Sequence, residues 1–89
     1  MKESFTLHGR SIRIARLLKG VSVKELGELT GINPNYVAII ERNEGTISHR
    51  NYFRFLRALR RDLGFTDQQL VAISILVENI EEVEKGALD

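Results

Sequence analysis

Apolar residues recur at intervals of three and four along most of the chain, a spacing typical of amphipathic helices. The spacing predicts five helices and no convincing strand, with expected ranges of 7 or 10 to 19, 23 to 30, 34 to 42, 49 to 62 and 67 to 85. A length of 89 residues fits one domain. We therefore expect a single all-α domain over residues 1–89, with a compact core at 7–62 and a long C-terminal helix at 66–85.

Capping residues mark the starts of four of these helices. In a capping box, a Ser or Thr is followed three residues later by Glu or Gln, and each side chain bonds the backbone of the other residue. The two boxes are Ser22 with Glu25 and Thr66 with Gln69. Ser48 is a third N-cap, and Asn33 is a fourth, followed by Pro34 at the first helical position, where a backbone N–H is not needed. Asn43 and Gly45 tolerate positive φ and are expected to end the third helix.

The second and third helices are short and are joined by a tight turn, which is the pattern of a helix-turn-helix. Gly31 is suited to the left-handed conformation of that turn, and Gly27 has no side chain to hold the third helix away from the second. The apolar residues expected between the two helices are Leu26, Ile32, Val37 and Ile40. One supersecondary unit therefore accounts for residues 22–42.

Charge is distributed unevenly along the chain. Residues 1–61 contain twelve Lys or Arg and five Asp or Glu, a net charge of +7, whereas residues 62–89 contain one Lys and seven acidic residues, a net charge of −6. A basic region favours a polyanionic partner such as nucleic acid, because contacts with phosphate release condensed counterions. Two solvated faces are an equally good explanation of the charge pattern alone.

Composition disfavours several classes of function. The chain has no Cys, and His8 and His49 have no neighbours that indicate a metal cluster or a catalytic group, so we expect no cofactor, no metal and no enzymatic activity. The first residues lack the apolar segment of a signal peptide, and no apolar run approaches the roughly 20 residues of a membrane span. We therefore expect a cytoplasmic, nucleoid-associated protein.

The C-terminal helix has apolar residues on nearly every side, most densely in LVAISILV at 70–77. Packing on the first and fourth helices would bury one side only, so a contact between two copies across a two-fold axis is expected to cover the other side. The residues expected in this dimer interface are Leu70, Ile73, Leu76, Val77, Ile80 and Val83. The acidic residues expected to lie away from DNA are Glu78, Glu81, Glu82 and Glu84. The alternative is a helix that packs only within its own domain.

Residues 9–60 resemble the phage-repressor-like, Cro/C1-type helix-turn-helix proteins, also called the xenobiotic-response-element type. The matching residues, at the spacing of that family, are Gly27, Gly31, Val37, Ile40 and the pair Arg16 and Glu41. The resemblance implies a five-helix, lambda-repressor-like DNA-binding domain. For Arg16 and Glu41 it implies a largely buried ion pair that joins the first helix to the end of the third and has a structural role.

Three positions depart from the pattern of that family. Val23 stands where relatives often have a Gln that touches phosphate, and Asn43 stands where they often have Gly. Glu44 stands where relatives often have a basic residue, and its negative charge would repel phosphate. Together these departures imply weak binding of phosphate on the side of the domain that carries these three residues.

The third helix is expected to enter the major groove, which is about 12 Å wide and admits one helix. Because Val37 and Ile40 face the core, the opposite face is expected to meet base edges through Asn33, Asn35, Tyr36, Ile39 and Arg42. Asn33 is chiefly a cap, so Asn35 is the stronger candidate for reading a base. The residues expected to contact phosphate are Ser22, Asn43, Thr46, His49 and Arg50. A stripe on the fourth helix, which either is solvated or contacts phosphate, consists of Arg54, Arg57, Arg60 and Arg61.

These features lead to the expectation of a sequence-specific transcriptional regulator whose partners are double-stranded DNA and a second copy of the chain. A dimeric repressor bound to a pseudo-palindromic operator is the first hypothesis. The alternative is an antitoxin that neutralises a partner toxin and regulates its own operon; an anti-repressor is the other candidate protein partner. A helix-turn-helix used only for protein contact is the third hypothesis.

Overall fold

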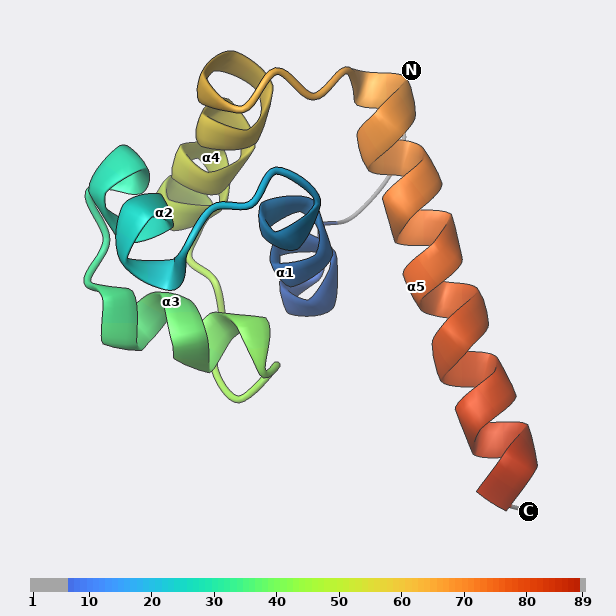
Figure 1. Cartoon of the computed structure of the whole chain (residues 1–89). Coiled ribbons are helices and arrows are strands. Elements are labelled where there is room, and N and C mark those ends of the chain that lie inside the picture. The colour runs from blue at the N-terminus through green and yellow to red at the C-terminus, as the bar shows by residue number, and fades with distance from the viewer. Residues whose placement is uncertain (1–6, 89) are drawn as a thin grey trace.

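The computed structural model describes the backbone of residues 7–88 and the side chains of residues 7–80. The described chain is all helical, as expected, with the order α1 (Gly9–Leu18), α2 (Val23–Thr30), α3 (Pro34–Glu41), α4 (His49–Arg57), η1 (Ala58–Asp62) and α5 (Asp67–Leu88). The first four helices lie together, while α5 lies on the side of α1 and extends beyond it (Figure 1). None of the helices, over the residues described, has the length and apolar character that a membrane crossing requires.

The expected capping interactions are present at the starts of four helices. The backbone N–H of Glu25 donates to Ser22 Oγ at 3.0 Å, and the N–H of Ser22 donates to Glu25 Oε1 at 2.8 Å. These hydrogen bonds lower the pKa of Glu25. The second box joins Thr66 and Gln69 at 2.9 and 3.1 Å. The single caps are Asn33, which accepts from the N–H of Asn35, and Ser48, which accepts from the N–H of Asn51.

The fourth helix was expected to be one regular α-helix, and its last turn differs. After Arg57 the chain forms the π-helical turn η1, in which the N–H of Leu63 donates to the carbonyl of Ala58 at 3.0 Å. The wider turn accompanies the burial of two consecutive residues, Ala58 and Leu59, which are both within 1% of complete burial. The π-helical turn η1 contacts α2. The pattern of apolar residues in the sequence did not predict this change from α-helical geometry.

Two glycines permit the tight arrangement of α2 and α3. Gly31 ends α2 with a φ of 74°, in the left-handed region expected for this turn. A Cβ atom on Gly27 would lie 2.8 Å from the carbonyl oxygen of Ile32 and 3.1 Å from Pro34 Cγ, so a larger residue would push α3 away. The four apolar residues expected between the helices are all buried, namely Leu26, Ile32, Val37 and Ile40.

A buried ion pair joins α1 to the end of α3, as the family resemblance implied. Arg16 Nε lies 2.8 Å from Glu41 Oε2, and Arg16 Nη2 lies 2.9 Å from Glu41 Oε1. A third donor, Nη1, bonds the carbonyl of Val21 after α1. The hydrogen bonds with Glu41 raise the pKa of Arg16, while burial acts in the opposite direction. This bidentate pair therefore holds the end of α3 against α1.

The expected dimer interface on α5 needs correction. Leu70, Ile73 and Val77 are buried inside the protomer, because this side of α5 packs with α1 and the rest of the core. They are not available to a second copy unless the domain opens. Leu76 and Ile80 are exposed, and so is Ile75, which was not in the expected set. The side chain of Val83 lies outside the described residues.

Candidate nucleic-acid interface

The short helix α3 packs against the core with one face, and its other face is accessible to solvent. Val37 and Ile40 are almost completely buried, and Glu41 is buried in its ion pair with Arg16. The opposite side therefore carries the residues expected to meet bases. In Figure 1, α3 forms an outer edge of the four-helix group, and no other helix covers that edge.

The two asparagines at the start of α3 have different surroundings. Asn33 Oδ1 accepts a hydrogen bond from the backbone N–H of Asn35 at 2.8 Å, so this oxygen is already used for capping. The side chain of Asn35 is exposed and bonds no other described residue. An unpaired amide has both a donor and an acceptor, which is what bidentate recognition of adenine requires.

Tyr36 and Ile39 are less exposed than expected for residues on the face of α3 opposite the core. Tyr36 is half-buried, and its hydroxyl donates to the carbonyl of Thr46 at 2.9 Å, which ties α3 to the loop before α4. Ile39 was expected to be exposed, but it is also half-buried. A Cβ atom on Gly45 would lie only 3.1 Å from Ile39 Cγ2, so the loop after α3 covers part of this side chain.

Arg42, the last of the five candidate base-reading residues, is exposed at the end of α3. Its Nε atom lies 3.0 Å from Glu44 Oε1, and both side chains are more than half exposed. Glu44 therefore neutralises Arg42 when DNA is absent, in addition to the repulsion of phosphate expected from the sequence. Because an exposed pair of this kind contributes at most about 1 kcal/mol, it leaves Arg42 free to exchange partners.

The five candidate phosphate-binding residues are all exposed. Ser22 Oγ accepts the capping bond from Glu25, which leaves its hydroxyl hydrogen able to donate. Asn43 has a φ of 62°, so this position adopts the left-handed conformation for which relatives often use Gly. Thr46 lies in the loop before α4, and its carbonyl accepts from Tyr36. His49 and Arg50 occupy the first turn of α4, where helix N–H groups favour anions.

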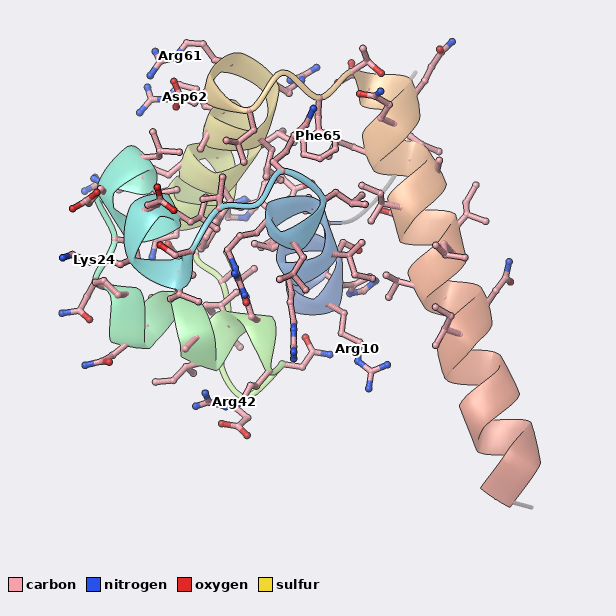
Figure 2. All side chains as sticks on the ribbon, viewed as in Figure 1. Arg10, Lys24, Arg42, Arg61, Asp62 and Phe65 are labelled. Carbon is pink, nitrogen blue, oxygen red and sulfur yellow. The ribbon has the colours of Figure 1, made fainter. Side chains whose placement is uncertain are left out.

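Two basic residues on α1 were missed by the sequence analysis. Arg10 and Arg13 line a hollow with Glu41, Arg42 and Glu44 beside the end of α3. Figure 2 shows Arg10 and Arg42 on the same lower edge of the domain. Their spacing of three residues, which places both arginines on one side of α1, is the sequence signal that indicates them.

Gly9, at the start of α1, was also missed. A Cβ atom there would overlap the carbonyl oxygen of Ile40 and would lie 2.9 Å from its carbonyl carbon. The backbone of α1 therefore touches the backbone of α3 near its end. Together with the Arg16–Glu41 pair, this contact gives α3 two points of attachment to α1.

Comparison with known proteins agrees with this geometry. A helix-turn-helix family model matches residues 12–66, which is more than half of the chain. Neither the curated proteins nor the solved structures gave a significant match. The matched region contains α2, α3 and the ion-paired residues Arg16 and Glu41. The chain belongs to the Cro/C1-type helix-turn-helix family, a family of DNA-binding transcription regulators.

Proposed function

We propose that this regulator is a homodimeric repressor that binds a pseudo-palindromic operator and blocks access of RNA polymerase to a promoter. The observation that carries the proposal is the accessible side chain of Asn35 on a helix whose opposite face is fixed in the core. In this family geometry the exposed edge of α3 enters the major groove. Two copies in successive grooves stand about 34 Å apart, one helical turn of DNA.

Polar and basic residues around α3 supply the contribution to affinity that is independent of DNA sequence. Ser22, His49 and Arg50 flank the helix from α2 and α4, and Arg13 flanks it from α1. Such contacts set the position of the protein on the duplex, whereas contacts with base edges determine which sequence is preferred. Replacement of Asn35 and replacement of Arg13 should therefore have different effects on DNA binding.

We expect Asn35→Ala to reduce binding to the preferred site by about 1–3 kcal/mol and to leave binding to unrelated duplexes nearly unchanged, because only the preferred site offers the matching base edge. Arg13→Ala is the matched control on the neighbouring helix. It should weaken binding to both duplexes alike and reduce the slope of log K against log salt by about one. Fluorescence anisotropy over a range of salt concentrations measures both quantities.

Equal losses on the two duplexes for Asn35→Ala would show that this residue does not read a base. An antitoxin, the second hypothesis, is distinguished by a different experiment, which is purification of the protein expressed from its own operon. A stable complex with the product of an adjacent gene would favour the antitoxin. A protein that purifies alone and binds DNA upstream of its own gene would favour the repressor.

A further inference from the structure

A groove along α4 and η1 has features that DNA binding by α3 leaves unexplained. Its volume is about 800 Å³. Five cationic side chains line it, at the spacing of one helical stripe: Arg50, Arg54, Arg57, Arg60 and Arg61. Phe53 and Leu56 supply its apolar surface, and Phe53 is 61% exposed. The groove therefore combines strong positive charge with a large exposed aromatic ring.

Most of this charge is not neutralised within the described part of the chain. Arg60 pairs with Asp67, and Arg61 lies 3.4 Å from Asp62. The side chains of Arg50, Arg54 and Arg57 form no hydrogen bond or ion pair with a described residue. Neighbouring like charges on one helix face repel each other, so an anionic partner would stabilise this face.

The groove extends away from the edge that carries α3. Figure 2 shows Arg61 at the upper end of the domain and Arg42 at the lower end. Only Arg50, in the first turn of α4, belongs to the residues placed near DNA. The groove leads away from α3, and Phe53 is exposed in it. An amphipathic acidic helix therefore fits the groove better than does the phosphate backbone of the DNA that α3 contacts.

The second half of α5 has the complementary composition. Figure 1 shows this half extending beyond the other helices, and Leu76 and Ile80 are exposed on it. Four glutamates follow Val77 in the sequence, at positions 78, 81, 82 and 84. At helical spacing, positions 81 and 84 continue the series 70, 73 and 77, so the apolar series that packs in the core is followed by acidic residues.

We propose that the second half of α5 binds in the arginine groove of a second copy of this chain. In a two-fold dimer each protomer gives its α5 and receives that of its partner, so the contact is made twice. Glutamates pair with the unneutralised arginines, and Leu76 and Ile80 cover Phe53 and Leu56. This inference rests on the proposed homodimer and names the surface that the exposed residues of α5 contact.

Charge reversal on each side tests the contact. The groove variant is Arg54→Glu/Arg57→Glu, and the helix variant is Glu78→Lys/Glu81→Lys. The alternative in which Arg54 and Arg57 contact phosphate is tested alongside, by the affinity of the groove variant for DNA. Because like charges would face each other, each variant alone should show a dimer Kd raised by roughly a hundredfold or more. An equimolar mixture should restore the dimer, since both contacts then join opposite charges. Analytical ultracentrifugation measures mass, and circular dichroism checks the fold of each variant.

The wild-type protein supplies a test that requires no substitution. Added salt should raise its dimer Kd steeply if arginines and glutamates form the contact, whereas a purely apolar contact between two α5 helices would be nearly insensitive to salt. Dimers of wild-type affinity in both variants would overturn the proposal and leave the homodimer intact. A groove variant that dimerises normally but loses affinity for every DNA sequence would also overturn it. A monomeric wild-type protein would overturn this contact and the homodimer together.

Discussion

Replacement of Glu41 by alanine should lower the free energy of unfolding by about 3–5 kcal/mol, because the guanidinium of Arg16 is left buried without its charged partner. The geometry supports an effect of this size, since the pair is bidentate and the side chains are only 11% and 5% exposed. Small domains have a total stability of about 5–15 kcal/mol, so the variant should be partly unfolded at moderate temperature. Urea denaturation followed by circular dichroism measures the change.

The exposed pair of Arg42 and Glu44 provides the control for this substitution. Glu44→Ala also removes a carboxylate paired with an arginine, at 3.0 Å instead of 2.8 Å, but this pair lies at the surface, where the expected change is at most about 1 kcal/mol. The double variant Arg16→Met/Glu41→Leu should recover much of the lost stability, because it leaves no buried charge. Equal destabilisation by Glu41→Ala and Glu44→Ala would contradict the structural role assigned to Arg16 and Glu41.

Replacement of Gly9 by alanine should destabilise the domain, although alanine is the better helix former. A Cβ atom at this position would overlap the carbonyl group of Ile40, and neither backbone can move without displacing a helix. We expect a loss of about 1–3 kcal/mol or more, as for other substitutions that overfill a packed interior. The urea midpoint measures this effect. Arg13→Ala, at an exposed position of the same helix, should change stability by less than about 0.5 kcal/mol.

The same substitution tests how α3 is held in place. If α1 and α3 separate at Gly9, the angle of α3 changes and affinity for the preferred DNA site falls together with stability. A variant Gly9→Ala that is as stable as the wild type would show that the close approach of the two backbones is not a constraint on this domain.

Features determined by neighbouring residues could be predicted from the sequence. The capping boxes at Ser22 and Thr66 and the left-handed turn at Gly31 depend on residues within a few positions, and the structure confirms them. The pairing of Arg16 with Glu41, which are 25 residues apart, was predicted because the family has an arginine and a glutamate at this spacing, and local chemistry did not indicate it. Family resemblance therefore supplied the long-range information that periodicity lacks.

Features that depend on three-dimensional packing could not be predicted in the same way. Periodicity showed that α5 has several apolar sides, but only its contact with α1 shows which side is buried, so Leu70, Ile73 and Val77 were misassigned. The partial cover of Ile39 depends on the path of the loop at Gly45. The contact at Gly9 joins backbones 31 residues apart in sequence and has no signature in side-chain pattern.

Selection of duplexes from a random-sequence pool by the purified protein tests the central claim, which is that the exposed face of α3 reads bases. The wild-type protein should enrich two inverted half-sites whose centres lie one helical turn apart, about 10 base pairs. The same selection with Asn35→Ala should lose the preference at one position in each half-site and keep the others. A wild-type protein that enriches no sequence over the starting pool, although it binds duplex DNA, would contradict the claim.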